Sequence, residues 1–445
     1  MDEDKFALVE KILKDVDNIL SKNADLCSFD IVPVDSNFRN KSPVLLLENC
    51  LGLESWCMKH VYMYCYSELM DKYFVKPKRK AAKSSVNSER LEKLLNVTLL
   101  LNPELNSFWN KRRELVLRSL LDKSAELRFT KLVLSRKPKC NDAFSHRRWL
   151  LEAVLKDENL TTRDIEALVN EELHICQLTS DKSPNNYHSW NHRIWLLKTL
   201  KLVEKKFDLN FLYVKEYNFS EGWVSKHISD FSCFHYRQFC IRNIFAIGNE
   251  HWKSFESAID VNLRKSFIRV LALHFPKDST MQASEDDLVS YSQESLINLL
   301  LSYSSKNCDC IVDNVLFCRK LEILFHELVL NNELVRFYKD HETLWYHRRF
   351  IVHEILSSMH DYFGVVRLNG ALVKDICRNS NHDELRQKQA KIVRYDSNSI
   401  YSSVLFNVLL SHEKEFIKER HNEHDNYAGR HEKYLKFVEG LNNVM

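Results

Sequence analysis

Residues 184–197 read PNNYHSWNHRIWLL, and this stretch recurs in degenerate form along the chain. Each copy contains a central aromatic residue, and an arginine follows it three positions later. The five pairs are Trp109 and Arg112, Phe144 and Arg147, Trp190 and Arg193, Phe234 and Arg237, and Trp345 and Arg348. Six positions before the first three aromatic residues stand Pro103, Pro138 and Pro184. One pattern at five places identifies an internal repeat.

The spacing and the composition together predict an all-α fold. Successive aromatic residues of the first four copies are 35, 46 and 44 residues apart, which is the length of one helix–turn–helix unit in a helical solenoid. The 445 residues include only 7 glycines and 7 prolines, far below the usual ~7% and ~5%. A sheet-rich chain needs glycine at its tight turns, so we expect an α-α superhelix of repeated helical hairpins.

The interval before the fifth copy is longer than one repeat. Phe234 and Trp345 are 111 residues apart, which leaves room for a degenerate repeat or an insertion, and the polar, acidic segment 276–295 favours an inserted loop. We therefore divide the chain into residues 1–89, N-terminal helices with a basic linker; 90–250, the first four repeats; 251–335, an insertion with a polar loop and helices; and 336–445, the fifth repeat with C-terminal helices.

The part before the repeats is less regular. Residues 6–20 have the apolar spacing of one helix face, and residues 23–43 read as a loop. Residues 44–74 read as a hydrophobic helix or helix pair, divided near Gly52. The basic run at 76–85, KPKRKAAKSS, reads as an exposed linker, with a nuclear-localisation signal as the weaker alternative.

Charge and hydropathy exclude several classes of protein. The chain has 64 basic and 61 acidic side chains and a formal net charge of +3, whereas nucleic-acid binding calls for a concentrated basic face. No stretch approaches 18 uninterrupted apolar residues, so no membrane span is expected. The acidic, amphipathic start is unlike a signal peptide. The 12 scattered cysteines are typical of reduced thiols, which favours a cytoplasmic protein.

No metal site is predicted in this chain. Cys308 and Cys310 have no second pair at zinc spacing, and the common metalloprotease, hydrolase and nucleotide-loop motifs are absent from the sequence. The stretch that contains His421, His424 and His431 reads as a solvated helix face in a polar tail.

The shared aromatic and arginine positions are expected to be structural. Three residues apart, they lie on one helix face about one turn from each other. We expect each aromatic ring to wedge between adjacent hairpins. Each arginine would use its planar fork to bind carboxylates or helix-end carbonyls of a neighbouring repeat. A residue that only packs the helices should recur in every copy of the repeat. The functional residues should therefore be those that differ between copies.

The variable positions just before the aromatic residue are the candidate site. Helix starts present free N–H groups and a partial positive charge, which together bind anions. The second and third copies place there Lys139, Asn141 and Asp142, and Asn186, Tyr187 and His188. A lysine, a phenol and an imidazole at two neighbouring helix starts could hold a phosphate or diphosphate. The alternative is ordinary capping and turn chemistry.

The pattern P-x-N-Y-x-x-W-x-x-R resembles the repeat of protein prenyltransferase α subunits. Residues 184–195, 138–150 and 344–350 carry it most clearly, and the similarity covers about 90–250 and 335–355. The resemblance implies a crescent of helical hairpins that wraps a β subunit, itself an α-α barrel. It implies no cofactor on this chain, since the catalytic zinc and the isoprenoid cavity belong to the β subunit.

The resemblance also assigns roles to the candidate residues. Lys139 matches the lysine that the family directs at the isoprenoid diphosphate, and Asn186, Tyr187 and His188 match the family's N-Y-H of the next repeat. Lys139, Tyr187 and His188 are thus the expected catalytic groups, with Asn186, Asn141 and Asp142 binding substrate.

Two positions depart from the family's pattern. Asn141 replaces a tyrosine, and Asp142 replaces a glutamine that helps to hold the C-terminal carboxylate of CaaX peptides. A carboxylate there would repel such a terminus.

The function implied is that of the α subunit of a heterodimeric protein geranylgeranyltransferase. It would transfer geranylgeranyl from its diphosphate to a C-terminal cysteine of an acceptor protein, together with the β subunit of the Rab enzyme. The alternatives are a non-enzymatic α-solenoid scaffold and, less favoured because of the balanced charge, an RNA-binding helical repeat.

Overall fold

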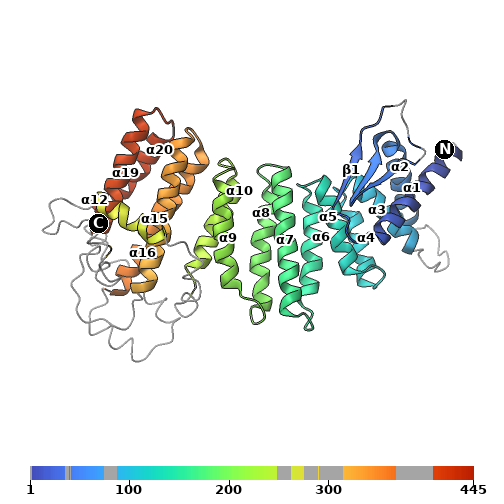
Figure 1. The fold of residues 1–445 in the computed structure, drawn as a ribbon, viewed down its shortest axis with the longest axis horizontal. Coiled ribbons are helices and arrows are strands. Elements are labelled where there is room, and N and C mark those ends of the chain that lie inside the picture. The colour runs from blue at the N-terminus through green and yellow to red at the C-terminus, as the bar shows by residue number, and fades with distance from the viewer. Residues whose placement is uncertain are drawn as a thin grey trace. The chain divides into compact units, whose positions relative to one another are not determined.

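The computed structural model describes residues 3–35, 42–74, 88–247, 262–274, 314–366 and 404–444, with residues 40 and 289. The basic run at 76–85, the acidic segment 276–295 apart from residue 289, and the pair Cys308 and Cys310 lie outside these residues. The chain forms two compact units, Met1–Leu209 and Asn210–Met445. Most of the described residues are helical, as the sequence predicts, and Figure 1 shows the helices of each unit.

The helices of the first unit are α1 (Glu3–Lys22), α2 (Ser55–Leu69), α3 (Ser88–Leu101), α4 (Asn106–Leu117), α5 (Lys123–Arg136), α6 (Asn141–Leu155), α7 (Thr162–Lys182) and α8 (Tyr187–Thr199). Short π and 3₁₀ turns extend α2 and α8, at Met70–Phe74 and Leu200–Val203. The second unit contains α9 (Leu209–Val224), α10 (Phe231–Ile244), α12 (Asn262–His274), α15 (Asn314–Phe337), α16 (Glu342–Val366), α19 (Val404–Asn422) and α20 (Ala428–Val444).

The repeat hairpins begin and end where their residues dictate. Asp122 caps α5 by accepting a hydrogen bond from the Ala125 amide, and Thr161 and Asp164 form a capping box at the start of α7. The prolines lie in the connections and not in the first helical turn. Helix α5 ends two residues before Pro138 and α6 begins three residues after it, because proline disfavours helical geometry in the residue that precedes it.

Residues 44–54 form two strands and the turn between them, so the helix predicted there is wrong. The loop predicted for residues 23–43 is also wrong in part, because residues 28–32 form a strand. Strands β1 (Ser28–Val32), β2 (Val44–Leu47) and β3 (Cys50–Glu54) form a sheet of order β1-β3-β2, with β1 parallel and β2 antiparallel to β3. Glu48, with φ of 50°, lies in the tight turn between β2 and β3. A Cβ on Gly52 would come 3.0 Å from Val32 Cγ2, so glycine permits the close pairing of β1 with β3.

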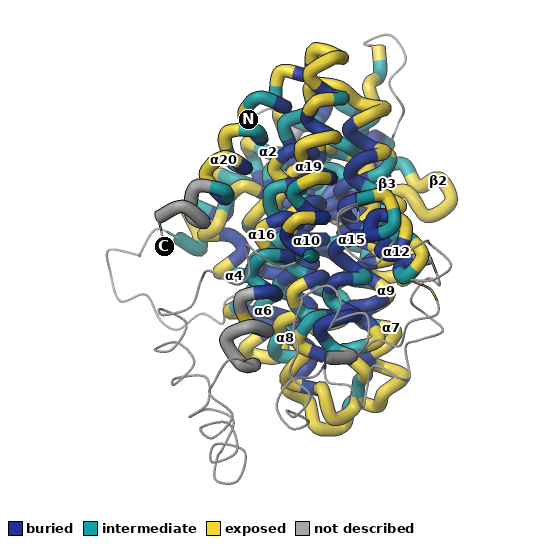
Figure 2. Tube along the Cα trace, turned by 90° about the vertical axis from the view of Figure 1, so that its left-hand side faces the viewer, coloured by how far each residue is buried: buried dark blue, intermediate teal, exposed yellow. Residues whose placement is uncertain are grey.

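The buried aromatic residues join successive hairpins within each unit. Trp109 of α4 lies 5.0 Å, between ring centroids, from His146 of α6, and Phe144 lies 5.2 Å from His192 of α8. The second unit repeats this contact between Phe234 and His347 and between Trp345 and His431. Figure 2 shows the buried positions along the helices in dark blue. These four aromatic residues therefore pack against the next hairpin.

Buried glutamates in each unit, which together we call the carboxylate ladder, bind the repeat arginines. Its members with both partners identified are Glu126, Glu172, Glu327 and Glu413. Each accepts a two-pronged hydrogen bond from the arginine of the preceding hairpin and another hydrogen bond from a histidine of its own hairpin. Arg147, for example, reaches Glu172 at 2.7 and 2.6 Å, and His192 Nε2 lies 3.0 Å from the same carboxylate. Paired in this way, the buried charges are compensated.

The carboxylate ladder shows to which helix α10 is bound within the long interval between Phe234 and Trp345. Arg237 of α10 binds Glu327 of α15, just as Arg147 of α6 binds Glu172 of α7. In the second unit Arg237 of α10 therefore binds across to α15, which packs with α16 as one hairpin. The ladder also continues to a further hairpin, α19–α20. There His431, predicted to be solvated, is fully buried and donates to Glu413 at 2.7 Å.

The inserted helix α12 is held by a chain of hydrogen bonds with a fixed direction. Arg348 donates to Oδ1 of Asn332 at 2.6 Å, which turns the amide nitrogen of Asn332 toward Nε2 of His412 at 3.1 Å. His412 must then donate from Nδ1 to Nε2 of His274 on α12, 3.0 Å away. Nδ1 of His274 lies 3.5 Å from Glu415. Burial lowers the pKa of His412 to about 3, so this imidazole is neutral.

The protein is expected to lose folding stability in acid because the carboxylates of the ladder become protonated. Burial alone would raise the pKa of Glu126, but the charge of Arg112 and the His146 hydrogen bond hold it at about 2, below its usual 4.5. Burial lowers the pKa of His146 from 6.5, although the neighbouring Glu126 acts to raise it. At these two groups the unfolded chain therefore binds more protons than the native one in the acid range.

We expect the melting temperature to fall once the pH drops below 6.5 and to fall more steeply between 4.5 and about 2. Circular dichroism melts over a pH series measure this. A melting temperature that stays constant from about pH 7.5 to about pH 3.5 would show that the ladder does not contribute in this way.

Candidate functional site

The candidate residues come from two turns that one side chain ties together. Asn186 is fully buried and caps α8 by accepting a hydrogen bond from the Ser189 amide at 3.3 Å. Its amide group donates to the carbonyl oxygens of Thr179 at 3.1 Å and of Pro138 at 2.7 Å. The turn before α6 is thereby fixed to the turn before α8. Asn186 positions the site and does not face the surface, contrary to the substrate-binding role expected for it.

A weaker contact of the same kind joins the preceding pair of turns. Cys140 occupies the position equivalent to Asn186, and its Sγ lies 3.6 Å from the carbonyl oxygen of Pro103. Asn185, just before Asn186, has φ of 54°, a left-handed conformation that asparagine tolerates better than most residues. Asn185 and Asn186 thus fix the backbone of this turn.

Four side chains of these two hairpins, Lys139, Arg148, Tyr187 and His188, form what we call the cationic cluster. Lys139 is exposed and has no ion-pair partner among the described residues. Tyr187 is 61% exposed, and its ring meets that of His188 edge-on, 5.8 Å between centroids. Burial, and then the charges of Arg148 and Lys139, lower the pKa of His188. Lys139 and Arg148 both lie near enough to His188 for their charges to lower its pKa.

Arg148 was missed by reasoning from the sequence. It follows Arg147, whose side chain turns inward to Glu172, so the next residue faces another direction on the helix. Arg148 is half-buried, donates to Ser145 Oγ at 2.9 Å and lies close enough to Tyr187 to interact with its phenol. The doubled arginine at 147–148 was the available signal, because only one arginine of the pair occupies the shared position.

Asn141 and Asp142 lie at the first turn of α6, beside the cationic cluster. Asn141 is exposed and Asp142 is half-buried. Burial and the neighbouring charge of Glu104 raise the pKa of Asp142, while Arg113 acts in the opposite direction. A negative region thus borders the positive one. The structure places five of the six predicted residues at the surface of adjacent helix starts, and the sixth, Asn186, beneath them.

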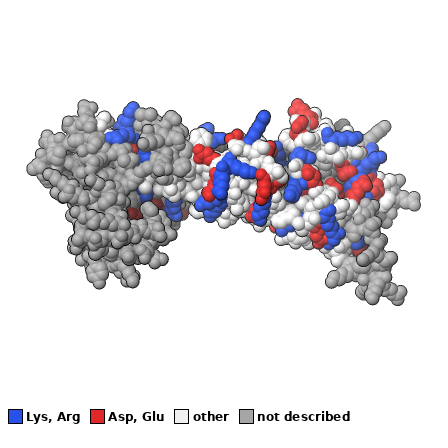
Figure 3. Space-filling view, turned by 90° about the horizontal axis from the view of Figure 1, so that it is seen from below, with Lys and Arg blue, Asp and Glu red and all other residues white. Residues whose placement is uncertain are grey.

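Two other kinds of site find no support in the described residues. On the face that Figure 3 shows, Lys and Arg side chains are interspersed with Asp and Glu. A continuous basic surface of the kind that nucleic acid requires is not seen among the coloured atoms. Within the described ranges, no three His, Cys, Asp or Glu side chains converge as metal ligands, and no helix has the length and hydropathy to cross a bilayer.

Comparison with known proteins identifies the repeat. Residues 124–154, 169–200, 213–244 and 324–355 match the protein prenyltransferase alpha subunit repeat. Protein prenyltransferase alpha subunit repeat-containing protein 1-B of Xenopus laevis is 30% identical over 369 residues, which cover 80% of this chain and 75% of the relative. The chain belongs to this prenyltransferase α-subunit repeat family. The human repeat-containing protein 1 is 29% identical and covers 78% of each chain.

More distant members of the family include an enzyme subunit. The geranylgeranyl transferase type-2 subunit alpha of Candida albicans is 29% identical over 194 residues, 40% of this chain and 49% of its own length. The four matched segments coincide with the hairpins α5–α6, α7–α8, α9–α10 and α15–α16. The flanking hairpins α3–α4 and α19–α20 lie outside the matches, yet they supply Arg112 and Glu413 to the ladder. The repeat therefore extends beyond its recognisable sequence.

Proposed function

We propose that this chain is the α subunit of a heterodimeric protein geranylgeranyltransferase of the type III class, acting in the cytoplasm with the Rab enzyme's β subunit. The reaction would transfer geranylgeranyl from its diphosphate to a C-terminal cysteine of an acceptor protein. Zinc on the β subunit would activate the acceptor thiol. The observation that carries the proposal is the cationic cluster, which lies at the second helices, α6 and α8, of two family repeats.

The chemistry of the cluster suits a departing diphosphate. As the bond from the isoprenoid carbon to oxygen breaks, negative charge builds on the diphosphate oxygens. Lys139, which has no carboxylate partner among the residues that the structure describes, would stabilise that charge together with Arg148, and the Tyr187 hydroxyl can donate to the same oxygens. Asn186 adds preorganisation, since it fixes the two turns before the ligand binds.

Co-purification tests the proposal. The chain should be co-expressed with the β subunit of Rab geranylgeranyltransferase and with a farnesyltransferase β subunit as the comparison. We expect a stable complex with the first, and transfer of labelled geranylgeranyl to protein cysteines by that complex alone. A chain that stays free of every β subunit is the result expected for a scaffold, and it would overturn the proposal.

The pKa of His188 gives a pH dependence to diphosphate binding. Because that pKa is lowered in the free protein, His188 is mainly neutral at neutral pH. A bound anion favours the protonated imidazole, so binding takes up a proton and the affinity should rise as the pH falls toward 6. Fluorescence titration of the heterodimer with an isoprenoid diphosphate measures this. The variant His188→Gln serves as the control for titration of the ligand itself, and equal pH profiles for the two proteins would contradict the prediction.

The carboxylate of Asp142 is proposed to select against acceptors that end in a free CaaX carboxylate. It lies next to Glu104 in a negative region, so such a terminus is repelled. Asp142→Gln should raise kcat/KM for CaaX peptides by about tenfold, equivalent to ~1.4 kcal/mol. Glu104→Gln is the matched control for loss of one negative charge. If Asp142→Gln gives no increase, the idea loses its support.

A further inference from the structure

Two cysteines in the small sheet lie close enough to react with each other. Cys27 immediately precedes β1 and Cys50 opens β3, and their Sγ atoms are 3.8 Å apart. The backbone holds this approach, since the Cys27 amide donates to the Asn49 carbonyl at 2.9 Å and Ser28 pairs with Cys50 in the strand register. Both cysteines are exposed, so small side-chain rotations can bring the sulfurs to the ~2.0 Å of a disulfide.

We propose that Cys27 and Cys50 are an oxidation site at which a peroxide forms a reversible disulfide between β1 and β3. One thiolate attacks a peroxide oxygen, the O–O bond breaks, and a sulfenic acid and hydroxide result. The second thiolate attacks the sulfenic sulfur, the S–S bond forms and the S–O bond breaks. The two thiol protons neutralise the two hydroxides. Two cysteines are thus oxidised by two electrons in all, and one hydrogen peroxide is reduced to two waters.

The surroundings make this pair more reactive than the other described cysteines. Burial raises the pKa of Cys57 to about 11 and that of Cys65 to about 12, although both lie on α2, next to the sheet. Cys140 and Cys176 are likewise buried, with pKa values of about 11 and 12. A buried thiol with a raised pKa offers little thiolate and little access, so it is inert to peroxide.

The disulfide would strengthen a part of the fold that supports the candidate site. The amide of Phe29 in β1 donates to Ser135 Oγ at 2.9 Å, and the guanidinium of Arg136 lies over the Phe29 ring at 5.9 Å. These residues end α5, which leads into the turn that carries Lys139. Closing β1 onto β3 restricts the unfolded chain between the two cysteines, so the oxidised protein should melt several degrees higher than the reduced one.

Differential alkylation tests the proposal on the full chain. Reduced protein is treated with a small excess of hydrogen peroxide, free thiols are blocked, and the digest is mapped by mass spectrometry. We expect a cross-linked Cys27–Cys50 peptide pair, about 2 Da lighter than the sum of its parts, which dithiothreitol reverses. The peptides of Cys57 and Cys65 are internal controls and should keep free thiols.

Single variants complete the test. Cys27→Ser and Cys50→Ser should each abolish the cross-link and the rise in melting temperature, with unchanged circular dichroism of the reduced protein. The proposal is overturned if peroxide leaves both thiols free. It is overturned equally if they become separate sulfinic acids or if each couples to a different cysteine, because a preformed pair should close before either occurs.

Discussion

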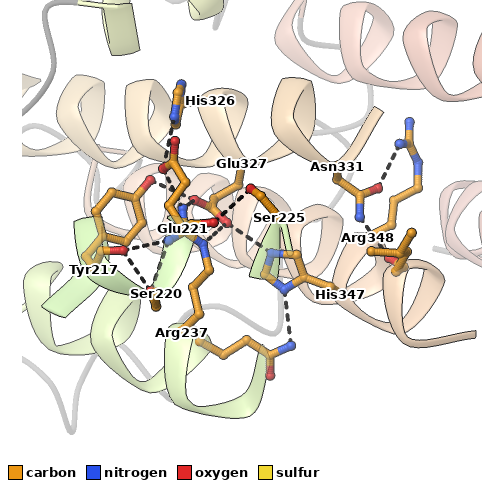
Figure 4. A network of polar contacts seen from close by, with 12 residues as sticks. Tyr217, Ser220, Glu221, Ser225, Arg237, His326, Glu327, Asn331, His347 and Arg348 are labelled. Atoms are coloured by element: carbon orange, nitrogen blue, oxygen red, sulfur yellow. Dashed lines mark hydrogen bonds and ion pairs between the residues drawn. The ribbon is translucent and has the colours of Figure 1, made fainter. Parts of the chain in front are cut away.

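Replacing Glu327 by alanine should lower the free energy of unfolding of the second unit by about 3 kcal/mol. Glu327 is fully buried and accepts hydrogen bonds from Arg237 Nε at 2.9 Å and from Tyr217 Oη at 2.7 Å; His347 Nε2 is 3.0 Å from it (Figure 4). Its removal leaves a buried guanidinium without its main partner. Glu221 stays 2.9 Å from Arg237, which is why we place the loss at the lower end of the ~3–5 kcal/mol for a broken buried pair.

Urea unfolding and thermal melts measure the effect, which corresponds to roughly 6–12 °C for a unit of this size. The matched control is Glu333→Ala, because Glu333 lies on the same helix but is exposed; we expect a change within ~0.5 kcal/mol. The double variant Arg237→Met with Glu327→Leu should recover part of the loss, since no unpaired charge remains. If Glu327→Ala melts with the wild type, the ladder is not what stabilises the stack.

The repeat could be predicted from sequence because its signal is local. An aromatic residue and an arginine three positions apart fix a helix face without any knowledge of the partners. The glutamates could not be assigned in the same way. Each binds an arginine of a different hairpin, at separations from 14 residues for Arg112 and Glu126 to 90 for Arg237 and Glu327. Connection lengths vary, so no fixed offset from the arginine exists.

A fixed offset does exist inside four of the described hairpins. The partner of the ladder glutamate follows it by 20 residues in the pairs Glu126 and His146, Glu172 and His192, and Glu327 and His347. Tyr236 takes the place of the histidine at the same distance from Glu216, and the last hairpin shortens it to 18 for His431. The 20-residue spacing could have been found in the sequence, but it does not locate His431, because the last hairpin has the shorter spacing of 18 residues.

The sheet was missed because its strands are short, and because β1, which contains Ser28 and Asp30, was read as part of a polar loop. A run such as residues 44–47 is too brief for periodicity to separate strand from helix. Within the site, the sequence indicated Asn186 as a ligand contact. The structure shows instead that it caps α8 and binds Pro138. An asparagine just before a helix more often caps that helix than binds a ligand. The outward direction of Arg148 could not be predicted, because it depends on Arg147 turning inward.

Replacing Lys139 by alanine should lower kcat of the heterodimer on the order of 100-fold while the complex persists. The prediction rests on the proposed function. Lys139 is exposed in a turn and makes no ion pair in the described part of the chain, so its removal disturbs no packing. Its charge matters most when the diphosphate becomes the leaving group, because the negative charge on those oxygens is then greatest. The loss should therefore fall mainly on kcat and less on KM.

Single-turnover transfer of labelled geranylgeranyl, with the complex checked by gel filtration, separates chemistry from assembly. The matched control is Lys137→Ala, which removes the same charge from an exposed position two residues earlier, outside the cationic cluster. We expect this control to stay within about twofold of the wild type, because Lys137 is exposed and does not act on His188 as Lys139 and Arg148 do. Arg148→Ala should fall between the two variants, since its guanidinium is half-buried and acts beside the lysine. Equal rates for Lys139→Ala and Lys137→Ala would contradict the prediction. They would mean that the cationic cluster plays no part in the reaction and that the diphosphate binds elsewhere.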